Sequence, residues 1–397
     1  MLNKNEILNA SEEVFKQVRS IRRHLHAHPE LSFKEFETSA FIAEQLRNAG
    51  IEIETGIAGT GITAMIGNAH GPVVALRADM DALPIQELNQ VEYRSQNPGV
   101  MHACGHDVHS SILLGTALLL NKFKDQLPGC VKLVFQPGEE VLPGGASLML
   151  KEGALENPRP KLILGQHVYP EMLAGDVGFC PGPYMASADE IYVTVRGKGG
   201  HAALPHRVVD PVLISAHLIV ALQQIVSRSA NPIIPSVLSF GKIIAAGATN
   251  IIPDEVKMEG TFRTFDERWR DEAHSKMIKL ATALAESMGG TCEFNIERGY
   301  PFLVNHEELT KKAKGFAREL LGAEHVHDLP QRMTAEDFSY FSQVMPACFY
   351  RLGTSSADGS NNFGLHNARF DIDETALKTG TALMSWLAIR NMQEPLV

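Results

Sequence analysis

Short runs of almost continuous apolar residues, separated by segments with helical periodicity, constrain the fold of this chain most strongly. Such runs are typical of strands covered on both faces, and four of them occupy residues 62–66, 73–76, 131–135 and 162–164. A segment with helical periodicity follows Asp107, between the second and third runs. The pattern therefore predicts an α/β fold with a central, mostly parallel sheet.

The pattern changes near residue 186, where alternating apolar and polar residues replace the continuous runs. Alternation is typical of strands with one exposed face, and the segment reads as strand, helix, strand, strand, helix and strand over 190–196, 210–226, 237–243, 256–263, 267–288 and 292–296. This order suits a two-layer α+β insert. We predict a discontinuous larger domain, 1–185 and 300–397, interrupted by a lid or association domain at 186–299.

Charge and apolar run length exclude several classes of protein. The net charge of -10 repels phosphate backbones, so we expect no nucleic-acid partner. The longest apolar run, 111–120, is half the roughly 20 residues that span a bilayer, and the first residues lack an export signal. We therefore expect a cytoplasmic protein without a membrane partner. Five scattered cysteines argue against a disulfide framework.

A dense cluster of metal-ligating residue types lies between Met101 and His109. The sequence Met-His-Ala-Cys-Gly-His-Asp-Val-His holds one thiol and three imidazoles. This mixture suits zinc or a neighbouring divalent transition metal. Gly105 allows a tight turn between Cys104 and His106, so both side chains could face one ion.

Further ligand-type residues follow the predicted strands directly. They are Asp79, Asp81, Glu139, Glu140 and His167. Open α/β sheets place their sites just beyond the carboxyl ends of the strands, so these side chains are expected to converge on one crevice. His366 lies in a loop beyond a predicted strand at 348–352 and could reach the same edge.

These residue types suffice for the hydrolysis of an amide. Of two adjacent carboxylates, one can bind metal while the other serves as a base. Divalent ions lower the pKa of a bound water toward about 7 and polarise a carbonyl. Two ions are favoured, because five ligands exceed the usual four of a structural zinc site: Cys104, His106, Glu140, His167 and His366. Asp81 then fits a role in orienting a ligand imidazole.

Six motifs, in order, resemble the amidohydrolases of the hippurate hydrolase and indole-acetyl amino-acid hydrolase type. These enzymes belong to the aminoacylase and carboxypeptidase superfamily of co-catalytic metallopeptidases. The motifs are Arg-Ala-Asp-Met-Asp-Ala-Leu-Pro84, Met-His-Ala-Cys-Gly-His-Asp107, Gln-Pro-Gly-Glu-Glu140, Gly-Gln-His167, Gly-Lys-Gly-Gly-His-Ala202 and Gly-Leu-His-Asn367. The similarity extends from Arg23 to His366.

The resemblance implies a zinc-peptidase-like catalytic domain and a lid that mediates dimerisation. It implies the same five metal ligands, with Glu139 as general base and Asp81 in support. Cys104 takes the place of a bridging aspartate in the wider superfamily, and the thiolate marks the subgroup acting on N-acyl amino acids. Two divalent ions per subunit are implied, zinc or manganese first, with nickel or cobalt next.

Three residues of the insert acquire roles from the same resemblance. His201 is expected to reach a neighbouring active site and to stabilise the developing oxyanion. Asn250 and Arg263 are expected to hold the free carboxylate of the substrate, since the planar guanidinium binds a carboxylate through two hydrogen bonds. The resemblance also implies a homodimer or a higher homo-oligomer.

Several polar residues near the motifs are not assigned to the metal. The histidines of the first helix are expected to be solvated or to cap it: His24, His26 and His28. His102 and His109 flank the ligand loop and are expected to support it. Asp79 replaces a metal-binding histidine of the wider superfamily, and we expect it to contact the ligands rather than the ions.

The favoured function is a metal-dependent amidohydrolase that splits N-acyl or aryl-acyl amino acids into a carboxylic acid and a free amino acid. A dipeptidase or carboxypeptidase with the same metal centre and a different acyl pocket is the alternative within the superfamily. A second class is a thiol hydrolase with Cys104 as nucleophile and His102 or His106 as base. A third is a metal-binding interaction protein without turnover.

Overall fold

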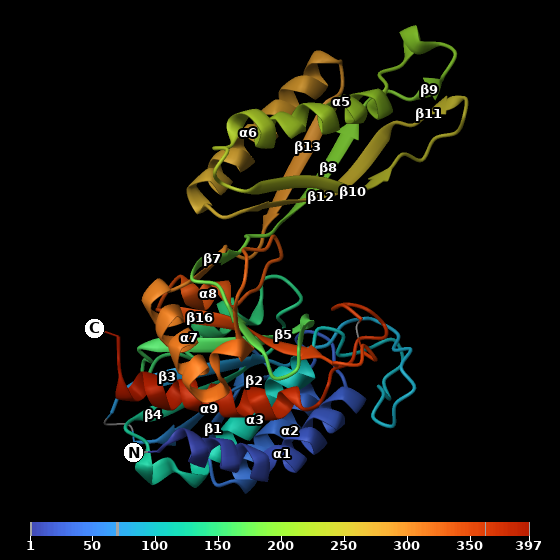
Figure 1. The fold of residues 1–397 in the computed structure, drawn as a ribbon. Helices are drawn as coiled ribbons and strands as arrows, with labels where there is room; N and C mark the ends of the chain where they lie inside the picture. Colours follow the sequence, from blue (N-terminus) through green and yellow to red (C-terminus); the bar gives the residue numbers. More distant parts are fainter. Residues whose placement is uncertain (1, 69–70, 362, 397) are drawn as a thin grey trace. The chain divides into compact units, whose positions relative to one another are not determined.

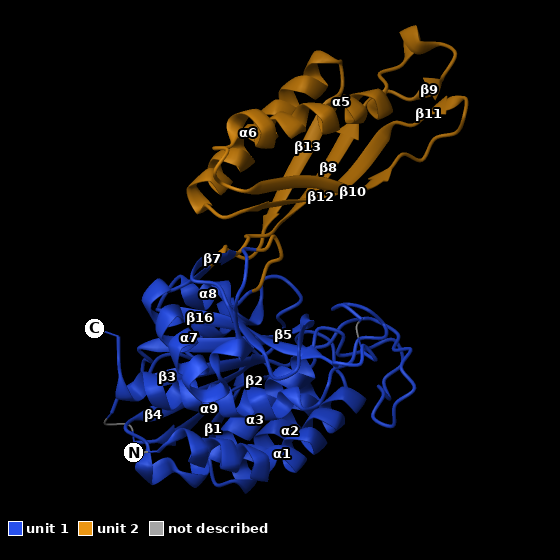
Figure 2. Cartoon of the chain, in the orientation of Figure 1, with its two compact units in different colours: residues 1–184, 304–331, 337–397 blue, residues 185–303, 332–336 orange. Residues whose placement is uncertain are grey.

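The computed structural model describes residues 2–68, 71–361 and 363–396 and divides into two compact units (Figures 1 and 2). Unit 1 comprises Met1–Tyr184, Val304–Gln331 and Asp337–Val397, and unit 2 comprises Met185–Leu303 and Arg332–Glu336. The insert expected at 186–299 falls inside the first segment of unit 2. The short second segment of unit 2 carries no sequence signal of its own.

Unit 1 contains an eight-stranded sheet in the order β1-β2-β4-β3-β5-β16-β6-β15. Its strands are β1 Glu52–Ile57, β2 Gly61–Gly67, β3 Val73–Asp79, β4 Cys130–Gln136, β5 Leu162–Leu173, β6 Val177–Phe179, β15 Val326–Asp328 and β16 Ala347–Ser355. The central strand β3 is parallel to β4 and β5, and β5 is parallel to β16. The pairs β1–β2, β2–β4 and β16–β6 are antiparallel. The predicted α/β fold with a mostly parallel sheet is confirmed.

Helices cover the central strands, which explains their continuous apolar sequences. Every residue of β3, β4 and β16 is buried. Helices α1, α3 and α9 lie side by side, and α3 and α9 contact the sheet (Figure 1). The helices of unit 1 are α1 Lys4–Ala27, α2 Phe36–Asn48, α3 His106–Lys122, α4 Gly145–Lys151, α7 Glu307–Leu321, α8 Ser339–Ser342 and α9 Ala376–Gln393.

The first helix begins at a capping box. The Asn3 side chain accepts hydrogen bonds from the backbone N–H groups of Asn5 and Glu6, and the Glu6 carboxylate accepts one from the Asn3 N–H. The helix ends at Ala27, two residues before Pro29, which lacks the N–H that a continuing helix needs. The chain then turns toward the sheet.

Unit 2 contains a four-stranded antiparallel sheet in the order β10-β12-β8-β13. Its strands are β8 Asp189–Arg196, β10 Ser236–Ile244, β12 Glu255–Thr264 and β13 Thr291–Arg298, and its helices are α5 Pro211–Gln224 and α6 Glu267–Ser287. Side chains of both helices and all four strands form one apolar core. The predicted two-layer α+β insert is confirmed. A two-stranded ribbon of β9, Gly200–His201, and β11, Ile251–Ile252, was not predicted.

One helical stretch in the described part of the chain, Pro211–Ser229, is long and apolar enough to cross a membrane by length and composition alone. The expectation that no segment reaches this length was wrong. It rested on continuous apolar runs, and polar residues interrupt this helix, so no such run marks it. Core helices of globular domains meet the same criteria. Its inner residues Ile214 and Leu218 pack in the core of unit 2, whereas Val220 on the outer face is 74% exposed.

Candidate metal centre

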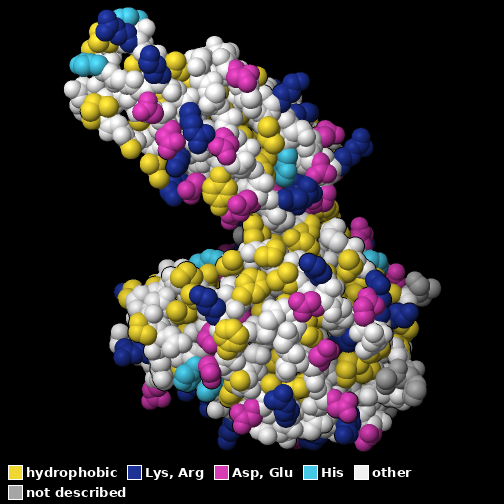
Figure 3. Space-filling view, turned by 180° about the vertical axis from the view of Figure 1, so that it is seen from behind, with side chains coloured by type: hydrophobic (Ala, Val, Ile, Leu, Met, Phe, Trp, Pro, Cys, Tyr) yellow, Lys and Arg dark blue, Asp and Glu magenta, His cyan; other side chains and the backbone are white. Residues whose placement is uncertain are grey.

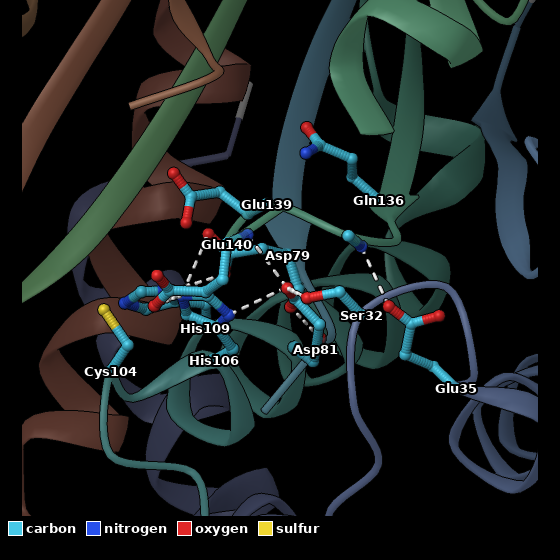
Figure 4. A network of polar contacts seen from close by, with 12 residues as sticks. Ser32, Glu35, Asp79, Asp81, Cys104, His106, His109, Gln136, Glu139 and Glu140 are labelled. Carbon is cyan, nitrogen blue, oxygen red and sulfur yellow. Dashed lines mark hydrogen bonds and ion pairs between the residues drawn. The ribbon is translucent and has the colours of Figure 1, made fainter. Parts of the chain in front are cut away.

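Two parallel strands of unit 1 bring their polar ends to one edge of the sheet. Asp79 is the last residue of β3, and it pairs in register with Gln136, the last residue of β4. Asp81 follows the first strand, and Glu139 and Glu140 follow the second after a turn. Figure 4 shows these carboxylates gathered beside Cys104 and His106. The predicted convergence at the sheet edge therefore holds for these residues.

His167 lies inside a strand rather than beyond its end. The sequence predicts a strand that stops near residue 164, but β5 continues to Leu173. The strand continues because β16 pairs with it over this stretch, with Arg351 opposite His167. The other neighbour, β3, pairs with β5 only as far as Gly165. His167 thus lies just beyond the last residue paired with β3, at the edge where Asp79 lies.

A glycine in the left-handed conformation places Cys104 and His106 on either side of one turn. Gly105 has a φ of 83°, and a Cβ atom there would lie 2.5 Å from the Val168 side chain. Only glycine fits this position without displacing Val168. Gly105 also precedes α3, whose first residue is His106.

Two groups of ligand-type residues share Cys104. The first is Cys104, His106 and His167, and the second is Cys104, Glu140 and His366; in each group the ligand atoms lie within 4.8 Å of one another. The Cys104 Sγ atom is 3.5 Å from the His167 Nε2 atom. The His366 Nε2 atom is 3.3 Å from a Glu140 carboxylate oxygen. The structure therefore brings all five predicted metal ligands together.

The loop that carries His366 is attached directly to the loop that carries Cys104. The His366 backbone N–H donates a hydrogen bond to the Ala103 carbonyl at 2.8 Å. His366 itself has a φ of 61°, a left-handed backbone conformation that residues other than glycine seldom adopt. Such strain persists only where the surroundings define the position, and it occurs often at functional sites.

The donor atoms fit divalent transition-metal ions. Among the described residues, the His106 Nε2 atom is buried without a hydrogen-bond partner. It lies 4.0 Å from the Glu140 Oε1 atom, the oxygen that His366 Nε2 also contacts. The other ring nitrogen of His106 donates to Asp81 at 3.1 Å, and His167 Nδ1 donates to the Val168 carbonyl at 2.8 Å. Both imidazoles thus direct Nε2 to the shared space, as metal-ligating histidines do.

The electrostatics of the ligands indicate that a cation would displace protons. Burial and the Glu140 carboxylate raise the pKa of the Cys104 thiol. Hydrogen bonds with Cys104 and Glu140 raise the pKa of His366 to about 10. Burial and Arg351 hold the pKa of His167 well below its usual range, so that imidazole is neutral and ready to bind. Metal binding therefore competes with protons at Cys104 and His366.

Asp81 and Asp79 contact His106 from two sides. Burial disfavours a charged carboxylate at Asp81, but the hydrogen bond from His106 lowers its pKa. Asp79 lies 3.7 Å from His106 Nε2. Arg77 and His109 hold Asp79 by contacts of 2.7 and 2.6 Å. Asp79 therefore contacts a ligand, and the structure shows what an aspartate can do at this position: it anchors His109.

Glu139 lies beside the ligand groups, and a different residue, Asp337, orients it. Its carboxylate lies in one group with His106 and Glu140, and the Asp337 N–H donates to it at 3.4 Å. The Asp337 side chain in turn accepts hydrogen bonds from Arg77, Gln136 and the Ala146 N–H, at 2.9, 2.8 and 2.9 Å. Glu139 is thus buried beside the ligands but oriented by Asp337.

The three predicted substrate residues lie at different places in unit 2. His201, in β9, pairs with Ile251, and the Ala202 N–H donates to the Asn250 carbonyl, so His201 and Asn250 are neighbours. Arg263 lies near the far end of β12 and donates to the Met333 carbonyl at 3.2 Å. Eight residue steps along β12, roughly 27 Å, separate Arg263 from the strand end that adjoins β9 and β11.

The interpretation of the first helix was wrong for one histidine. His26 is fully buried, and its ring donates to Asp107 at 2.8 Å and to Glu87 at 3.2 Å. Burial disfavours the imidazolium, but the carboxylates raise the pKa of His26. Arg22, one turn earlier, also donates to Asp107 at 2.9 Å. The sequence could have predicted that these two side chains lie together, since residues four apart share a helix face and Arg22 precedes His26 by four positions.

The other unassigned histidines near the motifs divide into two kinds. His28 Nδ1 contacts the His24 carbonyl at 2.8 Å, as the expected capping role requires. His102 is buried, and among the described residues neither ring nitrogen has a hydrogen-bond partner. Burial lowers the pKa of His102 to about 4, so the ring is neutral.

The chain is similar to known proteins over most of its length. The model of a family described as Peptidase family M20/M25/M40 matches residues 75–390. The N-acyl-L-amino acid amidohydrolase of Geobacillus stearothermophilus is 42% identical over 308 residues, which cover 77% of this chain and 83% of that protein. Thermostable carboxypeptidase 2 of Saccharolobus solfataricus is 39% identical and covers 97% of this chain and 98% of its own length.

The fold is also similar to solved structures. The Bacillus subtilis YXEP protein, described as a dinuclear metal binding peptidase from the M20 family, superposes with a TM-score of 0.82 at 33% sequence identity. The match covers 96% of this chain and 99% of that one. The similarity therefore extends over both units, and the family match over residues 75–390 spans the positions of the predicted site residues.

Proposed function

The chain belongs to peptidase family M20/M25/M40, and from that premise we propose that it is a metal-dependent amidohydrolase of N-acyl or aryl-acyl amino acids. The products are a carboxylic acid and a free amino acid. The relatives named N-acyl-L-amino acid amidohydrolase and thermostable carboxypeptidase support hydrolysis of an amide beside a carboxylate. A carboxypeptidase or dipeptidase activity is the second candidate, because that carboxypeptidase relative covers almost the whole chain.

One observation supports this proposal most directly: two groups of metal ligands share Cys104, and Glu139 lies beside them. Five ligands suit two divalent ions, for which we propose zinc or manganese, with nickel or cobalt as alternatives. When bound, such ions would activate a water molecule and polarise the amide carbonyl.

The residues of the chain supply the remaining steps. We assign Glu139 as the general base, which takes a proton from the attacking water and returns it to the leaving nitrogen. Asp81 keeps the His106 ring in the orientation that directs Nε2 to the ligand group. Arg263 and Asn250 are proposed to hold the substrate carboxylate, and His201 to stabilise the developing oxyanion.

The spacing within unit 2 favours a homodimer. His201 and Asn250 lie by the end of β12 that is roughly 27 Å from Arg263, so one copy of this unit cannot bring all three to one small substrate. We propose that a second copy supplies His201 and Asn250. Exposed apolar residues on the outer face of α5 and on the edge strand β10, including Val220 and Ile243, suit such an interface. A monomer in light scattering would remove the shared role of His201.

Other partners are not part of the proposal. On the face drawn in Figure 3, Lys and Arg side chains are interspersed with Asp and Glu, and the chain carries a net charge of -10. This distribution disfavours a nucleic-acid partner. We assign the outer face of Pro211–Ser229 to the second copy rather than to a membrane, and we propose a cytoplasmic location.

A thiol hydrolase is disfavoured by the environment of Cys104. A nucleophilic cysteine needs a lowered pKa and access to solvent. Cys104 is buried, and burial raises the pKa of its thiol. These surroundings suit a metal ligand better than a nucleophile.

An activity screen of the purified chain with defined metals tests the proposal. We expect N-acetyl and N-benzoyl amino acids to be hydrolysed faster than dipeptides, and chelation to abolish both activities reversibly. Faster turnover of dipeptides would favour the second candidate. Full activity after removal of metal, with an acyl group trapped on Cys104, would instead establish the thiol mechanism.

A further inference from the structure

A short turn after the first helix, residues 31–35, contacts the metal centre although none of its residues is a metal ligand. We name it the 31–35 turn. Two of its polar side chains, Ser32 and Glu35, point toward the loops that carry Asp81 and Glu140 (Figure 4). No sequence motif assigned a role to this turn.

Glu35 connects the turn to the loop that carries the base. Its buried carboxylate accepts hydrogen bonds from the Phe33 N–H at 2.9 Å, the Thr60 hydroxyl at 2.8 Å and the Gly138 N–H at 2.8 Å. Gly138 directly precedes Glu139 in the chain. Glu35 therefore holds the backbone directly before the proposed base, Glu139.

Packing reinforces this connection. Phe33 has a φ of 62°, a left-handed conformation that costs free energy for any residue other than glycine. Its ring lies against Gly138, where an added Cβ atom would come within 2.4 Å of it. The strained residue and the glycine thus fit each other closely, which leaves the loop before Glu139 little freedom to move.

Ser32 connects the same turn to Asp81. Its hydroxyl donates to one oxygen of Asp81 at 2.6 Å, and the Glu140 N–H donates to that oxygen at 3.0 Å. The other oxygen of Asp81 accepts from His106 at 3.1 Å. Asp81 therefore holds a ligand from each metal group, and Ser32 sets the rotation of the carboxylate that does so.

We propose that Ser32 and Glu35 are positioning residues, which set the distance of Glu139 and Glu140 from His106 through the 31–35 turn. The inference rests on the proposed function, because it assumes that Glu140 and His106 bind metal. It extends that function to a segment about a hundred residues earlier in the sequence. Loss of a group that hydrogen-bonds a metal ligand typically lowers metal affinity 10–100-fold. Ser32 and Glu35 act through Asp81 and Gly138 rather than on a ligand directly, so we expect the lower end of that range, about 10-fold, in each variant.

Titration of the metal-stripped, full-length chain with cobalt(II) tests the proposal. The variants are Ser32→Ala and Glu35→Ala, with Ser32→Thr and Glu35→Gln as the conservative replacements. Glu37→Ala, at an exposed residue two positions away, is the matched control. We expect the two variants to bind cobalt about 10-fold more weakly, with a changed thiolate-to-cobalt absorption band, and to lose kcat more than they raise KM. Ser32→Thr and Glu35→Gln should behave like the wild type, because threonine keeps the hydroxyl and glutamine keeps an oxygen that can accept from Gly138. The control Glu37→Ala should do so as well.

Thermal unfolding separates positioning from simple loss of structure. The proposal is supported if cobalt affinity and the absorption band change while the melting temperature of Ser32→Ala stays close to that of the wild type. Wild-type cobalt affinity and spectrum in both variants would overturn it, and so would losses that only follow a lower melting temperature. A wild-type chain that binds cobalt but hydrolyses no acyl amino acid would reject the proposed function and leave this test intact.

Discussion

A Glu139→Gln variant is expected to bind the same amount of metal as the wild type and to lose about 10²–10⁴-fold in kcat. The amide cannot accept the proton of the attacking water, but it has nearly the same shape and can still accept the hydrogen bond from the Asp337 N–H. Metal content by elemental analysis and steady-state kinetics on one acyl amino acid measure the two effects separately.

The neighbouring residue provides a matched control. Glu140→Gln removes the same charge one position later, but Glu140 belongs to the ligand group with Cys104 and His366. We therefore expect this variant to lose metal as well as activity. If Glu139→Gln lost metal and Glu140→Gln kept it, the two roles would be exchanged. If Glu139→Gln remained fully active, Glu139 would not be the base.

Replacement of Cys104 should have the largest effect on metal binding, since both ligand groups contain this residue. We expect Cys104→Ala to weaken binding of both ions by more than about 100-fold, because loss of even a group that supports a ligand costs 10–100-fold. Activity should then fall below detection at ordinary metal concentrations. Metal titration followed by calorimetry, with a parallel activity assay, measures both losses.

A second variant at this position separates the metal role from a nucleophilic one. Aspartate offers an anionic ligand of similar reach, so we expect Cys104→Asp to retain metal and part of the activity. A thiol nucleophile could not be replaced in this way. Equal and complete loss of activity in both variants, with metal content unchanged in each, would contradict the shared-ligand role.

The fold was predictable because its strands are covered on both faces. Continuous apolar runs mark β3 and β4, and the residues that follow them could be placed at one sheet edge without any tertiary contact. The family resemblance, which rested on local motifs around those same ends, is confirmed by the match over residues 75–390. Ligand types at strand ends were therefore the most informative feature of the sequence.

Residues whose roles depend on a distant partner were not predictable in this way. The end of β5 was misplaced because pairing with β16, about 185 positions away, extends that strand through His167. His26 was expected in solvent, yet it is buried against Asp107, which lies 81 positions later. Hydrophobic periodicity within one segment contains no information about such pairs.

The 31–35 turn shows the same limit within the site itself. Ser32 is an ordinary polar turn residue in the sequence, and its importance depends on Asp81, which lies 49 positions away. The left-handed conformation of Phe33 is equally invisible locally, because phenylalanine has no preference for it. The packing of the Phe33 ring against Gly138, which is distant in sequence, accompanies this conformation.

The most direct test of the account is an anomalous-scattering map from crystals soaked in manganese or zinc. The account predicts two peaks in each copy of the chain, one contacting Cys104, His106 and His167 and the other contacting Cys104, Glu140 and His366, with Glu139 bound to neither. A single peak away from Cys104, or a peak bound directly by Glu139, would contradict it.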